Sequence, residues 1–369
     1  MNEVTNNKKT AFYWDETCFW HGGGNYATVI PVGGFVQPLV AGGLPEAPET
    51  KRRLKNLIEA TGLSSELAIL GACKANTEDL LRIHPMNYLK TFKALSDKGG
   101  GELGLRTPFG PGGFEIAAKS AGLVKRAVTD VAQGRFRNAY ALSRPPGHHC
   151  LPDWPNGFCL LANIAIAIEA AKAAKLVNRV AVVDWDVHHG NGTEHIFYDR
   201  DDVLTISIHQ DRCYPHDTGS VDCQGEGKGL GYNVNIPLPA GSGHQTYLEA
   251  MQKIVLPKLR AFEPDMIVIA CGFDASAVDP IARMLCGSHT FREMTRMLMT
   301  ICEKIVAAHE GGYSELHVPF CGHAVLEELS NSKIHAPDPI HHRITVQQPD
   351  ERNQAHQSDI VRDLATALV

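Results

Sequence analysis

The chain has 369 residues, of which 44% are hydrophobic and 21% charged, so it can bury the core of one large globular domain or two smaller ones. Its formal net charge of −6 excludes a typical nucleic-acid binder, because no basic excess exists to neutralise phosphates. Ten scattered cysteines without a Cys-x-x-Cys pair argue against a zinc ribbon, and no apolar run approaches the roughly 18 residues of a membrane span.

In chain order, the polar N-terminus lacks the apolar core of a secretory signal, so we expect a cytoplasmic protein. The segment from Phe19 to Pro48 is rich in Gly, Pro and aromatic residues, which predicts a functional loop or an oligomer contact. The apolar spacing of residues 49–61 predicts a helix. A second Gly/Pro-rich loop follows from Gly99 to Gly113.

A repeated pattern then begins, in which apolar runs end in polar clusters and helical stretches separate most of them. The runs are AYALSRPPGHH (139–149), VAVVDWDVHH (180–189), VLTISIHQ (203–210), MIVIACGFD (266–274) and IVAAHEGGY (305–313), and the helical stretches include 162–175 and 247–262. This alternation predicts an α/β fold with a mostly parallel sheet covered by helices on both faces. Ligands of such sheets bind beyond the carboxyl ends of the strands, so the polar clusters should converge there.

The cluster 184–189 (DWDVHH) contains the strongest candidate metal ligands. Residues two apart in an extended segment point the same way, so Asp186 and His188 can reach one ion. Asp274, at the end of another strand, is the best third ligand. Two carboxylates and one imidazole suit zinc or ferrous iron, and three protein ligands leave positions open for water and substrate.

Two adjacent histidines, His148 and His149, follow a rigid Pro-Pro-Gly turn. They are either further metal ligands or, more in keeping with a hydrolytic site, a general base and its neighbour. Asp184 and Asn191 in the neighbouring strand-end loop can fix their tautomers. Unlike partners would give the two rings different pKa values and different roles.

Two further groups complete the candidate site. Gly311 and Gly312 allow a sharp turn close to a ligand, after which Tyr313 either donates to the oxyanion of a tetrahedral intermediate or simply packs behind the turn. Phe158 and Tyr214 either form a narrow slot for an alkyl chain or belong to the core.

At this point the chain resembles the arginase–deacetylase family, and within it the bacterial histone-deacetylase-like amidohydrolases close to class II histone deacetylases. The matching strings are RPPGHHC (144–150), NGFC (156–159), VVDWDVHHGNGT (182–193), TISIHQ (205–210), CGFDASAVDP (271–280) and HEGGYS (309–314). All of them occur in family order between about Trp14 and about Leu329. The resemblance implies a single catalytic domain over residues 1–369 with the arginase/deacetylase fold. It also implies that the 14–50 loop lies near the active-site rim and that residues 335–369 pack on the domain as a C-terminal extension.

The resemblance also implies roles for individual residues. It implies one zinc on Asp186, His188 and Asp274, with His149 as general base paired to Asn191 and His148 as electrostatic partner paired to Asp184. Tyr313 matches the oxyanion donor, and both Asn191 and Glu310 are class II features. The implied substrate contacts are Gly157, Phe158, Tyr214, Glu102, Ile281, Gly311 and Gly312, with Tyr214 standing where the family more often has Phe. Potassium is implied at two sites: Asp184, Asp186, His188, Ser207 and Ile208 for the first, and Phe197, Arg200, Val203 and Tyr232 for the second.

The expected activity is hydrolysis of acyl-lysine or a similar N-acyl amine, with no nucleic-acid or membrane partner. Related bacterial enzymes form tetramers, which makes the 19–48 loop a plausible subunit contact. The nearest alternative is acetylpolyamine deacetylation, although the position where polyamine-selective relatives often carry glutamate is the apolar Ile281. A two-manganese, arginase-like enzyme would need further aspartate ligands. An acyl-lysine binder without activity would lack the base, a zinc ligand or Tyr313.

Overall fold

The computed structural model describes residues 8–37 and 43–369, so residues 38–42 of the expected loop lie outside the described residues. Within them, eight strands form one parallel sheet in the order β10-β9-β8-β11-β12-β7-β1-β4. The strands are β1 (Thr10–Tyr13), β4 (Ala68–Leu70), β7 (Asn138–Ala141), β8 (Val180–Asp184), β9 (Val203–Gln210), β10 (Asn233–Leu238), β11 (Met266–Cys271) and β12 (Ile305–His309). This architecture confirms the predicted α/β class.

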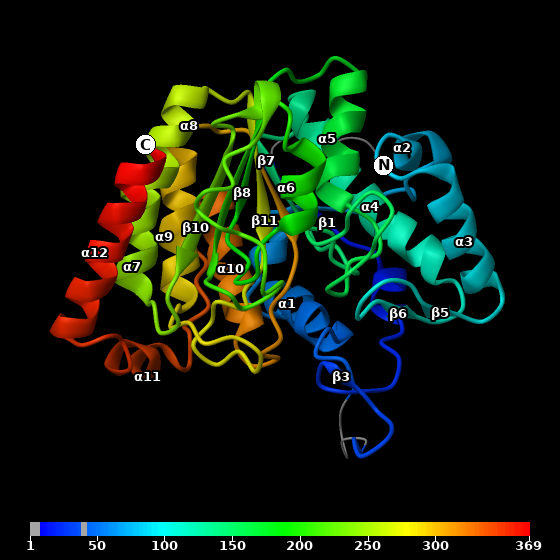
Figure 1. Cartoon of the computed structure of the whole chain (residues 1–369), viewed down its shortest axis with the longest axis horizontal. Coiled ribbons are helices and arrows are strands. Elements are labelled where there is room, and N and C mark those ends of the chain that lie inside the picture. The colour runs from blue at the N-terminus through cyan, green and yellow to red at the C-terminus, as the bar shows by residue number, and fades with distance from the viewer. Residues whose placement is uncertain (1–7, 38–42) are drawn as a thin grey trace.

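Helices cover both faces of the sheet (Figure 1). One face carries α1 (Pro48–Ala60), α7 (His244–Ala250), η4 (Met251–Val255), α8 (Leu256–Phe262), α9 (Ser288–Met299), α10 (Val318–Ser330) and α12 (Glu351–Leu368). The other face carries α4 (Gly113–Ala132), α5 (Asn163–Ala173) and α6 (Asn191–Phe197), with α2 (Thr77–Leu81) and α3 (Met86–Asp97) beyond them. Shorter elements are α11 (His341–Val346), η1 (Glu16–Trp20), η2 (Leu63–Ser65), η3 (Gly227–Gly229) and the two-stranded pairs β2 (Tyr26–Ala27) with β3 (Ile30–Pro31) and β5 (Gly101–Glu102) with β6 (Pro108–Phe109).

The central strands are buried on both faces, which explains their continuous apolar sequences. In β8, Ala181 and Val183 pack toward α7–α10, whereas Val180 and Val182 pack toward α4 and α5. The five strands that the apolar runs predicted are present. The helix expected over 247–262 is also present, with a π-helical turn at Met251–Val255 in its middle.

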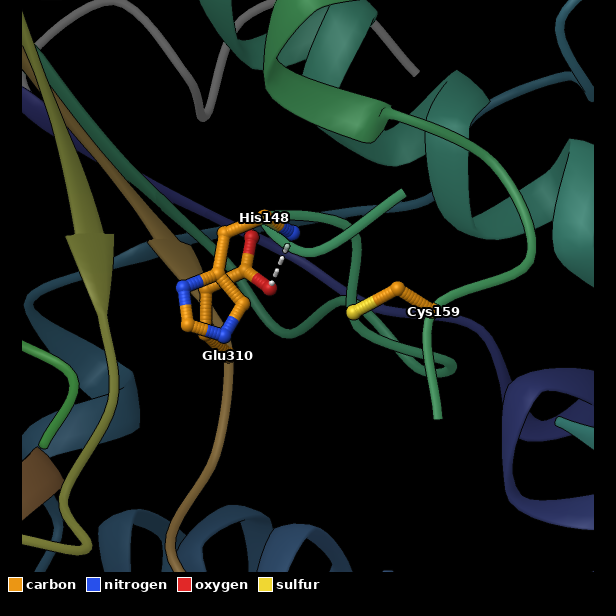
Figure 2. Close-up of side chains that lie close together, drawn as sticks. All are labelled: His148, Cys159 and Glu310. Carbon is orange, nitrogen blue, oxygen red and sulfur yellow. Dashed lines mark hydrogen bonds between the residues drawn. The ribbon is translucent and has the colours of Figure 1, made fainter. Parts of the chain in front are cut away.

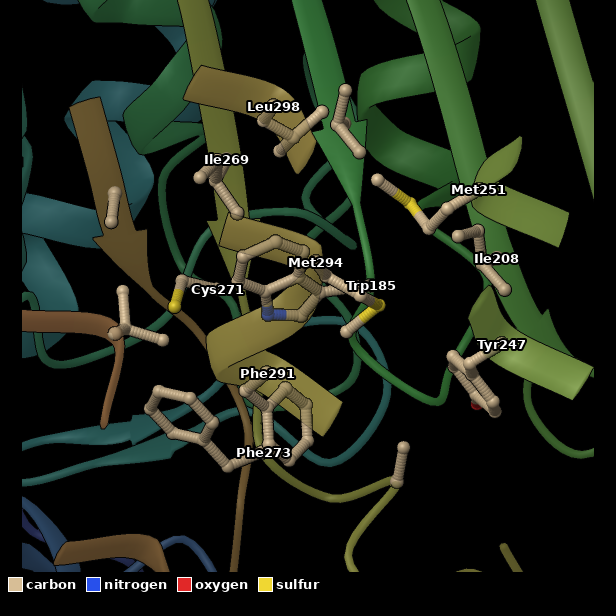
Figure 3. Packing of buried hydrophobic residues seen from close by; sticks show 14 of the residues in the cluster. Trp185, Ile208, Tyr247, Met251, Ile269, Cys271, Phe273, Phe291, Met294 and Leu298 are labelled. Atoms are coloured by element: carbon tan, nitrogen blue, oxygen red, sulfur yellow. The ribbon is translucent and has the colours of Figure 1, made fainter. Parts of the chain in front are cut away.

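Trp185 anchors the segment that follows β8. Its side chain is fully buried and packs with Phe291 of α9 (Figure 3). Phe273 packs against the ring of Phe291 in turn. Because side chains alternate along an extended segment, burying Trp185 on one side turns Asp184 and Asp186 to the other. Core packing therefore fixes the direction in which the two aspartates point.

Two negative findings concern the described residues alone. None of their helices combines the length and apolarity that crossing a bilayer requires. All ten cysteines are free thiols, so a hydrophobic core rather than disulfides holds the domain together.

Candidate metal centre and active-site cavity

The predicted ligands meet at the carboxyl edge of the sheet. Asp186 and His188 follow β8, and Asp274 follows the neighbouring strand β11. His188 Nδ1 lies 3.1 Å from Asp186 Oδ1 and 3.1 Å from Asp274 Oδ2. One atom from each of the three buried residues thus lies within 4.8 Å of the others. This is the convergence that strand-end logic predicted.

The arrangement of the two carboxylates fits a bound cation. Their outer oxygens accept backbone hydrogen bonds, from Gly311 N to Asp186 Oδ2 (2.8 Å) and from Val187 N to Asp274 Oδ1 (2.7 Å). The remaining oxygens face His188. Both side chains are fully buried, and burial together with the Asp186 carboxylate raises the pKa of Asp274 to about 6. A metal ion would remove this repulsion, so the donor set suits zinc or another divalent ion.

His148 pairs with a carboxylate. Its Nδ1 lies 2.9 Å from Asp184 Oδ2 at the end of β8. Burial favours the neutral ring, but the carboxylates of Asp186 and Asp184 outweigh it and raise the pKa of His148 to about 10. His148 is therefore held as an imidazolium.

His149 pairs with an amide instead. Its Nδ1 lies 2.8 Å from Asn191 Oδ1 at the start of α6. Burial and the adjacent rings of His148 and His188 lower the pKa of His149 well below its usual value. With Nδ1 donating to the amide oxygen, the neutral ring keeps Nε2 free to accept a proton. The two adjacent histidines thus have the unlike environments that their expected roles require.

Tyr313 approaches the metal ligands from the turn after β12. Its backbone N–H donates to Asp279 Oδ2 at 2.9 Å, and a Cβ added to Gly311 would lie 2.9 Å from its hydroxyl. Burial and the carboxylates of Asp274 and Asp186 raise its pKa well above the usual value. The hydroxyl consequently stays protonated and can donate a hydrogen bond beside the ligands.

A cavity of about 180 Å³ leads from the surface to these groups. Its walls include Phe158, whose ring meets that of Tyr313 edge-on at 5.8 Å, and Tyr214, whose hydroxyl donates to Asn156 Oδ1 at 3.2 Å. The full lining is Val29, Arg106, His149, Gly157, Phe158, His188, Cys213, Tyr214, His216, Ile281 and Tyr313. Phe158 and Tyr214 therefore both line the cavity, and Phe158 also packs in a small buried cluster with Tyr26, Leu44 and Tyr313.

Glycines permit the close approach of three segments at the closed end of this cavity. Gly157 has φ +54°, and a Cβ there would lie 2.3 Å from the ring of His149. A Cβ on Gly311 would lie 2.2 Å from Asp274 Oδ2. Gly311 and Gly312 lie behind the cavity instead of lining it, so their contribution is to bring β12 close to the ligands.

The residues that line the cavity differ from the expected substrate contacts at two positions near its opening. Glu102 is exposed and outside the cavity lining, because its carboxylate accepts from Tyr26 Oη and from Thr107 N. Arg106 lines the cavity instead, with its guanidinium 5.1 Å from the centre of the Tyr214 ring. Sequence reasoning missed Arg106 because it lies in an irregular loop, where spacing says nothing about direction.

Glu310 supports the histidine turn from behind. Its Oε2 accepts from Gly147 N at 2.7 Å and from His148 N at 3.1 Å, and Cys159 lies nearby (Figure 2). All three side chains are buried, and burial raises the pKa of Glu310 to about 7. Glu310 thus joins the end of β12 to the turn that presents His148 and His149.

The residues expected to bind potassium fall into two separate places. Asp184 and Ser207 are direct register partners on β8 and β9, next to the ligand segment. Phe197, Arg200, Val203 and Tyr232 gather near the amino ends of β9 and β10, where Arg200 N donates to Phe197 O and Thr205 N to Tyr232 O.

Fold and site together define an α/β protein with a candidate metal centre and an acid–base pair at the carboxyl edge of a parallel sheet. Comparison with known proteins specifies this class further. The family model described as "Histone deacetylase domain" matches residues 44–329. The histone deacetylase-like amidohydrolase of Pseudomonas aeruginosa is 54% identical over 97% of this chain and 96% of the relative, and histone deacetylase 8 of Arabidopsis thaliana is 35% identical over 80% and 81%.

Among solved structures, the crystal structure of the HDA15 HD domain aligns with a TM-score of 0.81 and 30% identity over 97% of both chains. The chain therefore belongs to the histone deacetylase family, as its motifs predicted. Membership of this family supports amide hydrolysis as its chemistry.

Proposed function

We propose that this chain is a zinc-dependent deacylase, which hydrolyses the amide of an acyl-lysine or a similar N-acyl amine to a carboxylic acid and a free amine. One observation supports this proposal above the others. Three candidate ligands, a neutral histidine and a protonated tyrosine converge at the closed end of one narrow cavity.

Asp186, His188 and Asp274 would hold the zinc. When bound, zinc supplies Lewis-acid chemistry, making water acidic near neutral pH and polarising the scissile carbonyl. An arginase-like pair of metals would need further bridging aspartates. Among the described residues, the other group of three candidate ligands is His148, Cys159 and Glu310, which contains no aspartate.

Proton transfer is assigned to His149. Its free Nε2 accepts a proton from the attacking water and then returns it to the leaving amine, because Asn191 fixes the tautomer that leaves Nε2 available. His148, charged and paired with Asp184, is its electrostatic partner. The Tyr313 hydroxyl donates to the oxyanion that develops on the carbonyl. Because all the groups assumed missing in an inactive acyl-lysine binder are in place, we rank that alternative low.

The cavity suits a slender aliphatic chain with an amide at its end. Phe158 and Tyr214 provide aromatic walls, and Arg106, His216 and Ile281 are among the other residues that line it. None of the described residues that line it is a carboxylate, so a second ammonium group would find no counter-ion. This favours acyl-lysine over acetylpolyamines.

A comparison of substrates tests the proposal. We expect the metal-replete protein to turn over an acetyl-lysine peptide faster than acetylspermidine at equal concentration. Ile281→Glu adds a carboxylate to the lining, so it should shift the ratio toward acetylspermidine, whereas Ile281→Gln, of similar size but neutral, should not. A wild-type preference for the polyamine would contradict the substrate assignment, and no turnover of any N-acyl amine would contradict the activity.

We further propose that potassium occupies the two sites named above and that the chain assembles as a homotetramer through the 19–48 loop. The side chains of Trp20 and Phe35 in this loop are largely exposed to solvent. Such large exposed apolar side chains are typical of an interface. Replacing both with serine should dissociate the tetramer, which sedimentation experiments would detect.

The potassium sites are tested separately. Exchanging potassium for tetramethylammonium should alter turnover.

A further inference from the structure

A buried chain of three side chains connects the C-terminal extension to the loop that carries Asp274. Ser276 Oγ lies 2.6 Å from His317 Nδ1, and His317 Nε2 lies 2.8 Å from Asp338 Oδ2. The exposed fractions of Ser276, His317 and the Asp338 side chain are 1%, 0% and 5%. An ionised carboxylate only accepts, so Nε2 carries the proton and Nδ1 accepts from the serine hydroxyl. Every link of the chain is thus satisfied.

The order Ser-His-Asp is that of a hydrolytic triad, but this serine has no route to a substrate. Ser276 is buried, and none of the three residues lines the active-site cavity. A nucleophile must reach the carbonyl that it attacks. The chain therefore serves to hold neighbouring groups in place.

The groups that it holds belong to the active site. Ser276 lies in the loop after β11 between Asp274, a candidate metal ligand, and Asp279, which accepts from the Tyr313 backbone at 2.9 Å. His317 lies four residues after Tyr313. The backbone bond from Phe273 N to Gly311 O (3.0 Å) also joins these loops, so the bond from Ser276 to His317 is a further tie between the Asp274 loop and the Tyr313 loop. Together these ties fix the separation between Asp274 and Tyr313.

Asp338, the last of the three hydrogen-bonded side chains, lies outside the matched family domain, which ends at residue 329. Asp338 Oδ2 also accepts from Ser288 Oγ at the start of α9 (2.7 Å), and Oδ1 accepts from Ile340 N (3.0 Å). His335 binds the carboxylate of Glu327 separately, at 2.8 Å. Asp338 is thus fixed on three sides, and the extension has an anchor that does not depend on it.

We propose that Asp338 and His317 are positioning residues, which act through Ser276 to hold Asp274 and Tyr313 in their working geometry. This inference rests on the proposed function. It makes the C-terminal extension, residues 335–369, part of the working enzyme, because this segment supplies the carboxylate that orients His317. If these residues only stabilised the fold, replacing them would lower the free energy of unfolding without changing the metal affinity or the spectrum of the bound metal.

Two variants interrupt the hydrogen bonds between Ser276, His317 and Asp338, one at each end of the series. Asp338→Ala removes the carboxylate, and Ser276→Ala removes one hydroxyl while leaving the extension's anchors intact, so it tests the same chain if Asp338→Ala fails to fold. Two variants are matched controls. His335→Ala weakens a neighbouring anchor of the extension, and Ser288→Ala removes a second donor to Asp338 without touching His317. Asp338→Asn retains one oxygen that can accept from His317 Nε2 but replaces the oxygen that accepts from Ile340 N, so it should keep more of the function than Asp338→Ala.

The readouts separate this inference from the proposed function. The visible spectrum and dissociation constant of the Co²⁺-loaded full chain report the ligand geometry without any substrate, and kcat and KM are measured on an acetyl-lysine peptide. We expect both variants that interrupt the hydrogen bonds to weaken metal binding and lower kcat about tenfold with KM unchanged. The two controls should match the wild type, and Asp338→Asn should lie between the wild type and Asp338→Ala. Wild-type spectra and metal affinity in Ser276→Ala would overturn the inference, even for a protein that hydrolyses no acyl-lysine. An inactive wild type with altered Co²⁺ spectra in the variants would overturn only the proposed activity.

Discussion

At the level of single residues, the site depends on giving similar groups different protonation states. His148 and His149 are adjacent in sequence, yet one faces a carboxylate and the other an amide. The carboxylates of Asp186 and Asp184 raise the pKa of His148, whereas burial and the neighbouring rings of His148 and His188 lower the pKa of His149. Tyr313 completes the set as a donor, because its burial and the carboxylates of Asp274 and Asp186 raise its pKa.

Removing the Tyr313 hydroxyl should therefore affect the chemical step and little else. We expect Tyr313→Phe to lower kcat about 10²–10³-fold, the usual loss for one oxyanion donor, with metal content unchanged. Tyr214→Phe is the matched control, since its hydroxyl contacts the buried Asn156 instead of the metal ligands. It should keep kcat within a few-fold of the wild type. Equal steady-state kinetics for the two variants would refute the role given to Tyr313.

At the level of elements, the site forms because three strand ends approach one another very closely. Gly311 at the end of β12 has no side chain, which lets its N–H reach Asp186 Oδ2. A Cβ there would lie within 2.6 Å of oxygens from both Asp186 and Asp274. Neither neighbour can retreat, because backbone hydrogen bonds hold both carboxylates.

Gly311→Ala should therefore push the ligands apart. We expect zinc affinity to fall at least about tenfold, measured by competition with a chelator, and kcat/KM to fall with it. Gly110→Ala adds the same methyl group where no atom lies within 4 Å of the new Cβ, and it should bind zinc normally. Unchanged zinc affinity in Gly311→Ala would show that the ligand geometry is not as tight as described.

The same distinction between strand ends and loops explains what could be predicted from the sequence. Apolar runs identified β7, β8, β9, β11 and β12, and their polar ends located the ligands and the acid–base pair. The edge strands β4 and β10 and the neighbouring strand β1 were missed, because β1 and β4 are short and β10 contains two asparagines and a proline. Loops without periodicity gave no direction for Arg106 or Val29. The hydrogen bonds that link Ser276 to Asp338 through His317 join segments far apart in the sequence.

At the level of the whole molecule, a buried charge cluster attaches the N-terminal segment to the histidine turn. Glu46 Oε1 accepts from Lys51 Nζ and Arg144 Nε, each at 3.0 Å, and all three side chains are at most 1% exposed. Arg144 also donates to the carbonyls of Cys18 and His21. Burial disfavours the charged carboxylate, yet Arg144 and Lys51 outweigh it and lower the pKa of Glu46 to about 2.

This pKa predicts how the stability changes in acid. Because the folded pKa lies below the ordinary 4.5, the ionised Glu46 stabilises the fold fully above that pH, and the contribution is lost as the pH falls toward about 2. Glu46→Gln leaves two buried cations without their partner, so it should cost about 3 kcal/mol at pH 7. Chemical unfolding at several pH values should show this difference shrinking below pH 4.5. The control Glu59→Gln, in an exposed pair with Lys55, should change little. A difference that stays constant down to about pH 2 would refute the assignment.

The central claim is that one metal, held by Asp186, His188 and Asp274, makes this chain a deacylase. The most direct measurement is a titration of the metal-stripped protein with zinc while hydrolysis of an acetyl-lysine peptide is followed. We predict that activity is absent without metal and rises linearly to a plateau at one equivalent per chain, and that Asp274→Asn lacks this tight response. Full activity in the stripped protein, or a plateau only at two equivalents, would contradict the claim.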